Sequence, residues 1–194
     1  MTIELDHADA FAGFSALTRG WFESAFAAPT AAQVGAWNSI SSGQQTLVVA
    51  PTGSGKTLAA FLSAIDSLAT EPVPVEKLKR CRVLYVSPLK ALAADVERNL
   101  RSPLTGLARE AGLRGLPAPE ISVAIRSGDT PADQRRRQAT NPSDILITTP
   151  ESLFLILTSR ARESLRGVET VIIDEIHAVA GTKPGSVDGY TVDL

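Results

Sequence analysis

Cysteine is nearly absent from this sequence, and neither sign of charge dominates it. A single cysteine, Cys81, among 194 residues excludes a disulfide scaffold and argues against a zinc site built on cysteines. The net charge is −2, with a pI near 5.7. Bulk charge therefore does not hold the chain to DNA or RNA, and any contact with nucleic acid must come from local patches or from a part of the protein outside this sequence.

Long apolar runs and a leader segment are also missing. No apolar stretch approaches the ~20 residues that a membrane-spanning helix needs. The N-terminus carries Glu4, Asp6 and Asp9 rather than the basic region and apolar core of a signal peptide. We therefore expect a cytoplasmic protein with no membrane partner. With 44% hydrophobic and 21% charged residues, the composition is that of a globular domain with its own core.

The chain alternates short β-branched runs with longer helical stretches. The runs are rich in Val, Ile and Leu and are apolar on both faces, which is typical of parallel strands covered by helices on both sides. We expect an α/β fold with a parallel sheet. The expected strands are Thr46–Ala50, Arg82–Ser87, Ile121–Arg126, Asp144–Thr148 and Thr170–Asp174.

Helices are expected between these strands and ahead of the first one. Residues Ala10–Ile40 predict two or three helices with a break at Pro29, where Thr30 is a suitable N-cap. Pro131 and Pro150 mark the beginnings of two others. The later helices are expected at Lys56–Ala69, Leu89–Leu100, Pro131–Thr140 and Glu151–Ser159.

The segment APTGSGKT, Ala50–Thr57, follows an expected strand and opens an expected helix. The backbone N–H groups of a glycine-rich turn and the N-terminus of a helix together bind phosphate oxygens. Gly53 and Gly55 let the backbone pass close to the phosphates, Lys56 can reach the β- and γ-phosphates, and the Thr57 hydroxyl can ligate Mg²⁺. The alternative is a turn that only connects a strand to a helix. The predicted ATP-binding residues are Pro51, Thr52, Gly53, Ser54, Gly55, Lys56 and Thr57.

The segment VIIDEIH, Val171–His177, ends a strand with two acidic residues. Ligands of an open parallel sheet bind at the carboxyl ends of its strands. Asp174 can hold Mg²⁺, directly or through water, and Glu175 can accept a proton from an attacking water. The alternative is an acidic pair at an exposed strand end. His177 has no nearby Cys or His partner, which argues against a metal site there and leaves a structural role as its alternative.

APTGSGKT followed by DEIH resembles motifs I and II of superfamily 2 helicases of the DExH type. Further segments are similar in the same order: Pro29–Gln33 resembles a Q motif, Ser87–Val96 motif Ia, Ser127–Arg137 the segment over the nucleic-acid backbone, and Thr148–Leu153 motif Ib. The phrases WFESAFAAPTAAQVGAW and DEIHAVAGTK resemble the large helicase-related (Lhr) family. Members of that family are DNA-dependent ATPases that move 3′ to 5′ along single strands.

The resemblance implies a RecA-like P-loop NTPase domain, in which Ala50–Thr57 is the P-loop. It also implies the roles given above for the P-loop and for the acidic pair Asp174 and Glu175. It adds Gln33, which would read the adenine, and His177, which would couple the nucleotide site to a second motor domain. It also implies single-stranded DNA as partner, ATP with Mg²⁺ as the only small-molecule substrate and cofactor, and a role in DNA repair. The residues that it places near the nucleic-acid backbone are Pro88, Lys90, Arg126, Gly128, Thr149 and Pro150.

The loops that carry these residues follow strands, so their N–H groups and hydroxyls are expected at the ligand edge of the sheet. Such groups suit phosphate oxygens, and they position a strand without reading its sequence. RNA is therefore the alternative partner, because phosphate contacts do not distinguish it from DNA. Arg135–Arg137 is interpreted as a solvated helix face. The loops have no aromatic series, so base stacking is not predicted.

The sequence departs from the family beyond Lys183. A superfamily 2 motor has two RecA-like domains, the second of which supplies an arginine finger, and nothing after Lys183 resembles motif III. Pro184 stands where the family has a basic residue. We interpret residues 1–183 as an incomplete first RecA-like domain with a helical N-terminal extension. Residues 184–194 are interpreted as a divergent tail from a frameshift or truncation, with a natural divergent end as the alternative.

We therefore expect an ATP-dependent DNA helicase or translocase, present as an N-terminal fragment. Loss of an arginine finger costs ~10³–10⁵ in rate in comparable enzymes, so the fragment is expected to bind Mg·ATP weakly, to hydrolyse it poorly and not to unwind duplexes. Two alternatives remain open. One is a non-motor P-loop protein, such as a small kinase or a nucleotide switch. The other is a nucleotide- or nucleic-acid-binding module without motor activity.

Overall fold

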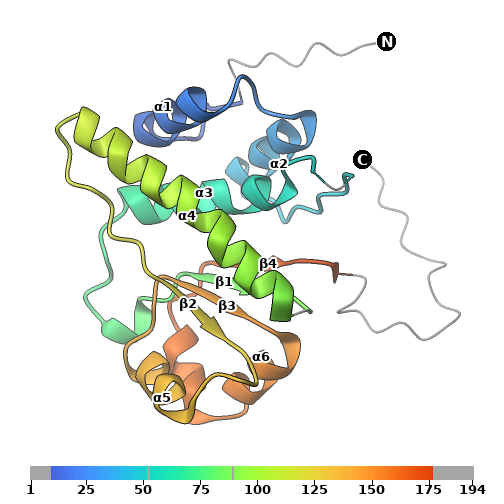
Figure 1. Cartoon of the computed structure of the whole chain (residues 1–194), viewed down its shortest axis with the longest axis vertical. Coiled ribbons are helices and arrows are strands. Elements are labelled where there is room, and N and C mark those ends of the chain that lie inside the picture. The colour runs from blue at the N-terminus through green and yellow to red at the C-terminus, as the bar shows by residue number, and fades with distance from the viewer. Residues whose placement is uncertain (1–9, 52, 89, 177–194) are drawn as a thin grey trace, which may run out of the picture.

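A parallel sheet forms the centre of the computed structural model, which describes residues 10–51, 53–88 and 90–176 (Figure 1). Within these residues the sheet has four strands in the order β2-β3-β1-β4. All neighbouring strands run parallel. The strands are β1 Val83–Val86, β2 Val123–Arg126, β3 Ile145–Thr148 and β4 Thr170–Ile173. The expected α/β fold is confirmed, and four of the five expected strands are present.

Helices lie on both sides of this sheet. In Figure 1 helices α1 to α4 lie on one side of the strands, and α5 and α6 lie on the other. No helix in the described part of the chain is long and apolar enough to cross a membrane. The helices are α1 Ala16–Ala25, α2 Ala31–Ser41, α3 Lys56–Thr70, α4 Lys90–Leu113, α5 Ala132–Thr140 and α6 Pro150–Leu157, with short 3-10 helices η1 Lys77–Lys79 and η2 Arg160–Leu165.

The central strands separate two apolar layers. Side chains alternate between the two faces of a strand, so Val83 and Tyr85 of β1 pack with the helices α1 to α4. Leu84 and Val86 point the other way and pack with Ile156 of α6. Strands β1 and β3 are buried along their whole length. The expectation of strands covered on both faces is therefore confirmed for these two strands.

The strand expected at Thr46–Ala50 is not formed. Residues 44–51 have no strand conformation, and Leu47 and Val49 are 47% and 86% exposed. An apolar run becomes a strand only when a neighbouring strand takes up its backbone N–H and C=O groups.

Within the described residues β4 is an edge strand, and Val171 and Ile173 on it are about half exposed. The prediction that helices cover both faces of β4 is therefore wrong.

Helix α4 is longer than its sequence predicts. We expected an end at Leu100. Pro103 lies beyond that end, and a proline in a helix interior costs about 3 kcal/mol. The helix instead runs through Pro103 to Leu113. Leu107 and Ala111 in the added part are fully buried and belong to the large core cluster. Full burial of a leucine side chain stabilises by about 1.5–3 kcal/mol, so the burial of Leu107 helps to offset the cost of the proline.

Two glycines of α4 provide a matched test of this packing. A Cβ at Gly106 would lie 1.9 Å from Nε1 of the buried Trp21, whereas a Cβ at Gly112 meets nothing within 4 Å. We expect Gly106→Ala to lower the free energy of unfolding by about 1–3 kcal/mol through overpacking. Gly112→Ala should raise it by about 0.5–1 kcal/mol because alanine favours a helix. Urea unfolding of both variants measures the difference, and equal effects would contradict the packing of α1 on α4.

A buried carboxylate ties three strands together at their amino ends. Asp144 precedes β3 and is 2% exposed. It accepts hydrogen bonds from Arg80 Nε at 3.0 Å, from Ser122 N at 2.8 Å and from Ser122 Oγ at 2.6 Å. Burial alone would raise the pKa of Asp144, but the hydrogen bonds from Arg80 and Ser122 bring it below its usual value. The carboxylate is therefore held in its charged form in the folded state.

This cluster predicts an acid-sensitive contribution to stability. Because the pKa of Asp144 is lower in the folded state, its contribution is fully present above the unfolded pKa near ~3.9 and is lost as the pH falls below that value. Asp144→Asn should lower the free energy of unfolding at pH 7 by about 1.5–3 kcal/mol. It should lower it much less at pH 3. Chemical denaturation across pH 3 to 7 tests this, and a constant difference between the proteins would contradict it.

Candidate nucleotide-binding site

The glycine-rich turn before α3 has the conformation that its sequence predicts. Gly53 and Gly55 have φ angles of 83° and 81°, in the left-handed region that glycine alone adopts without strain. Gly55 is the N-cap of α3, which begins at Lys56. A Cβ at Gly55 would also lie 2.5 Å from Nε2 of Gln33. The turn and the helix are thus confirmed, although the strand expected before them is not.

The Lys56 ammonium closes this turn. Its Nζ donates a hydrogen bond to the carbonyl oxygen of Ala50, so the side chain folds back over the loop. A bound phosphate would lie against the same loop. A phosphate oxygen is a stronger acceptor for an ammonium than a neutral carbonyl is. Lys56 is half-buried, as is Thr57 in the first turn of α3. Thr52 lies outside the described residues.

Helix α2 touches the turn through its first residues. Thr30 is its N-cap, as expected, and forms a capping box with Gln33. The Thr30 hydroxyl donates to the carbonyl oxygen of Ser54 at 3.0 Å, and Gln33 Nε2 donates to that of Gly55 at 3.4 Å. The Gln33 side chain therefore lies against the turn, where an adenine-reading role remains a prediction. Local sequence did not indicate the contact of Thr30 with Ser54, because it joins residues far apart in the chain.

Asp174 follows β4 directly, and its carboxylate is held on both oxygens. Oδ2 accepts a hydrogen bond from Tyr85 Oη at 2.5 Å, and Oδ1 accepts one from Glu175 N at 3.0 Å. Glu175 has a φ of 48°, a left-handed conformation that is uncommon outside glycine and is found at functional sites. Burial, followed by the hydrogen bond to Asp174, raises the pKa of Tyr85. The tyrosine therefore stays a neutral donor.

The residues present suit a magnesium ion. Mg²⁺ in phosphate-transfer sites is usually bound by one or two carboxylates together with substrate phosphates and water. Asp174 is such a carboxylate at the end of β4, and helix α3, which carries Thr57, packs against that strand. Stacking of Phe61 of α3 on Tyr85, with ring centroids 5.1 Å apart, joins the two elements.

The segments expected near nucleic acid follow three different strands at the same edge of the sheet. Pro88 follows β1, Gly128 follows β2, and Thr149 follows β3. Thr149 is the N-cap of α6, and Pro150 is the first residue of that helix. The buried Thr149 hydroxyl donates to Ser152 Oγ at 3.2 Å. The structure brings these segments together, but their contact with nucleic acid remains a prediction.

The side chains of two predicted site residues lie outside the described part of the chain. Lys90 is the first residue of α4, and its side chain is not among those described. His177 lies outside the described residues, so its coupling role remains a prediction.

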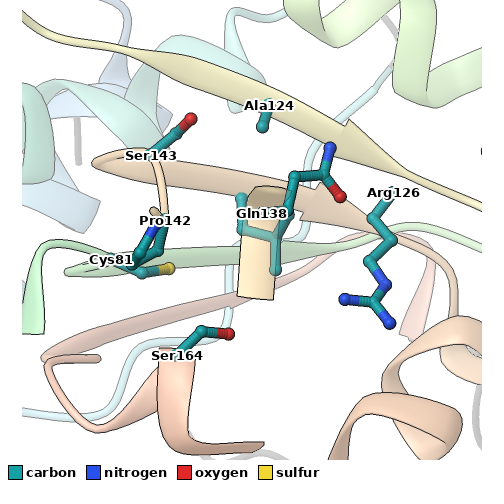
Figure 2. Close-up of a pocket in the computed structure, with 8 residues that line it drawn as sticks. Cys81, Ala124, Arg126, Gln138, Pro142, Ser143 and Ser164 are labelled. Carbon is teal, nitrogen blue, oxygen red and sulfur yellow. The ribbon is translucent and has the colours of Figure 1, made fainter. Parts of the chain in front are cut away.

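Arg126 lines a small internal pocket. Figure 2 shows its side chain beside Gln138, with Cys81 and Ser164 on the other sides of the pocket. Gln138 Nε2 donates to the carbonyl oxygen of Ile125 at 3.0 Å. Burial, and then the charge of Arg135, lowers the pKa of Arg126, while burial raises the pKa of Cys81 to about 12. Arg126 is thus partly buried in the domain.

Tyr85 is the functional candidate that sequence reasoning missed. The only signal was a hydroxyl within the apolar run RVLYVS. A hydroxyl that is buried in a strand needs a partner, but the sequence does not say which one.

Known proteins resemble this chain at high identity. The chain is 66% identical over 179 residues to the "Lhr helicase/ probable uracil glycosylase" of Mycolicibacterium smegmatis, covering 92% of this chain and 12% of that protein. It is 57% identical over 177 residues to the "Lhr helicase/uracil glycosylase" of Escherichia coli, covering 89% and 12%. The chain therefore spans about an eighth of the length of these curated relatives.

Solved structures agree with the fold. The structure of Mycobacterium smegmatis helicase Lhr bound to ssDNA and AMP-PNP matches with a TM-score of 0.84 at 66% identity, covering 90% of this chain and 22% of that one. The yeast DEAD-box splicing factor Prp28 matches with a TM-score of 0.67 at 20% identity, covering 92% and 39%, which shows the RecA-like helicase fold alone. The sequence pattern of the DEAD/DEAH box helicases matches residues 30–188. The chain therefore belongs to the DEAD/DEAH box helicase family.

Proposed function

We propose that this chain is the ATP-binding part of an ATP-dependent DNA helicase or translocase. The observation that carries the proposal is the turn at Gly53 and Gly55, whose left-handed backbone opens α3 at Lys56. Such a turn presents N–H groups and a helix N-terminus to phosphate oxygens. The similar helicase Lhr of Mycobacterium smegmatis was solved with AMP-PNP and single-stranded DNA, which supports both ligands here.

Each predicted residue of the nucleotide site has a chemical task in this proposal. Lys56 neutralises phosphate charge, and Gln33 reads the adenine. Asp174 and Thr57 hold Mg²⁺, which supplies positive charge to the phosphates when bound. Glu175 orients and deprotonates the attacking water. His177 is proposed to couple this site to a second RecA-like domain of a longer motor that acts in DNA repair.

The nucleic acid is proposed to lie across the loops that follow β1, β2 and β3. Pro88, Lys90, Arg126, Gly128, Thr149 and Pro150 are the proposed contacts. Backbone N–H groups and hydroxyls in these loops suit phosphates, so binding should depend little on base sequence. The alternative substrate is RNA, and the alternative function is a binding module that does not turn over ATP.

Three measurements on the purified chain test the proposal. A fluorescent non-hydrolysable ATP analogue, titrated with and without Mg²⁺, should bind in competition with ATP. Single-stranded DNA and RNA of one sequence should then be compared by anisotropy in the presence of that analogue. ATP hydrolysis should be measured with and without the DNA, and we expect a slow rate that the DNA increases. Binding without any turnover would favour the module, tighter binding of RNA would favour an RNA helicase, and no analogue binding would contradict the ATP site.

A further inference from the structure

The carboxylate of Asp174 is joined to the P-loop helix by two aromatic side chains. Tyr85 in β1 donates to Asp174 Oδ2 at 2.5 Å across the neighbouring strand β4. On its other side, the Tyr85 ring stacks on Phe61 of α3, with centroids 5.1 Å apart and planes inclined by 26°. Tyr85 is 2% exposed and Phe61 is fully buried. Both rings are therefore fixed by packing, and so is the direction of the hydroxyl.

The register of the sheet explains why these residues meet. Tyr85 is paired with Ile172 in the parallel ladder of β1 and β4. Asp174 lies two residues further along, so its side chain leaves the strand on the same face as Ile172. That face is the one covered by α3, since Ile172 packs against the cluster that contains Phe61. The backbone of Asp174 is fixed as well, because its N–H donates to the carbonyl oxygen of Val86 at 2.9 Å.

The hydrogen bonds leave the carboxylate oriented but still able to bind. A carboxylate has about four acceptor sites. Tyr85 takes one on Oδ2, and the N–H of Glu175 takes one on Oδ1. Within the described part of the chain no other hydrogen bond to this carboxylate is found, which leaves acceptor sites for a metal ion or its water ligands. Removal of a residue that orients a metal-binding carboxylate in this way typically lowers the metal affinity by about 10–100-fold.

We propose that Tyr85 is a positioning residue that sets the Asp174 carboxylate for Mg²⁺ and ties that carboxylate to the P-loop helix through Phe61. The inference rests on the proposed binding of Mg·ATP. Tyr85 then contributes to the affinity for the nucleotide when Mg²⁺ is present. It does not contribute to the affinity for the nucleotide without Mg²⁺. The competing explanation is that the hydrogen bond only stabilises the fold.

Tyr85→Phe tests this directly, because phenylalanine keeps the stacked ring and removes only the hydroxyl. The readout is the affinity for a fluorescent non-hydrolysable ATP analogue across a Mg²⁺ titration, with EDTA as the metal-free reference. We expect the Mg²⁺ concentration that gives half of the gain in affinity to rise about tenfold or more. The metal-free affinity should stay as in the unaltered chain. Mn²⁺ binding followed by electron paramagnetic resonance should weaken by a similar factor.

Ser122→Ala is the matched control. It also removes a hydroxyl that donates to a buried carboxylate, Asp144, at 2.6 Å, but at the amino end of the strands. It should lower the melting temperature without moving the Mg²⁺ midpoint. Phe61→Leu, which loosens the Tyr85 ring and keeps its hydroxyl, should raise the midpoint less, and it serves as the test if Tyr85→Phe does not fold.

Two results would overturn the assignment of Tyr85. One is an unchanged Mg²⁺ midpoint in Tyr85→Phe, which would make the bond purely structural. The other is a lowered midpoint, which would mean that Tyr85 holds the carboxylate back from the metal. If the unaltered chain itself shows no Mg²⁺-dependent binding of the analogue, the proposed nucleotide site has failed instead, and that outcome is distinct from the other two.

Discussion

Lys56→Ala is expected to lower the affinity of the chain for Mg·ATP about ten- to a hundredfold. Lys56 begins α3, and its ammonium donates to the carbonyl oxygen of Ala50. In the proposed complex a phosphate oxygen replaces that carbonyl. A hydrogen bond between charged groups contributes about 1.5–3 kcal/mol, which corresponds to that range of affinity. The measurement is a titration with the fluorescent ATP analogue at saturating Mg²⁺.

The control for this prediction is Lys79→Ala. Lys79 lies in η1 and pairs with Glu76 at 3.0 Å on the surface, with both side chains about half exposed. Its removal changes the net charge by the same amount but should leave the affinity for the nucleotide unaltered. The melting temperature of Lys56→Ala should also rise less than that of the unaltered chain when Mg·ATP is added, because a ligand that binds more weakly stabilises the folded state less. Equal affinities of the two variants would contradict the assignment of the P-loop.

The conformation of the glycine-rich turn and the position of the acidic pair could be predicted because the sequence signals for them are local. Glycines at 53 and 55, a lysine that opens a helix and an acid that ends a strand are each defined by a few consecutive residues. The capping box of Thr30 and Gln33 could be predicted for the same reason. The structure confirms the turn, the helix and the position of Asp174 at the end of β4.

Features that depend on distant partners could not be predicted. Residues 46–50 have the composition of a strand but are unpaired in the described residues, since pairing is a property of the sheet and not of the segment. Helix α4 passes Pro103 because tertiary burial of Leu107 and Ala111 outweighs the local preference. The bond between Tyr85 and Asp174 joins residues 89 positions apart. In each case a non-local interaction decided the outcome.

Trp37→Ala is expected to have the largest effect on stability, a loss of about 3–5 kcal/mol in the free energy of unfolding. Trp37 in α2 is 1% exposed. Its ring lies 5.2 Å from that of Phe14 and 5.5 Å from that of Phe22, and its Nε1 donates to the carbonyl oxygen of Ala59 in α3 at 3.1 Å. A domain of this kind has a total stability of about 5–15 kcal/mol, so the loss is a large part of it. Urea unfolding followed by circular dichroism measures it.

Trp37→Phe separates the two contributions of this side chain. Phenylalanine keeps most of the aromatic contact but leaves the Ala59 carbonyl oxygen without the indole donor, which should cost about 1–3 kcal/mol. Because α2 also presents Thr30 and Gln33 to the turn at Ser54 and Gly55, the alanine variant should bind the ATP analogue more weakly even where it remains folded. A loss of less than about 1 kcal/mol in Trp37→Ala would mean that α2 is not held on the P-loop helix by this core, and the nucleotide affinity should then be unaffected as well.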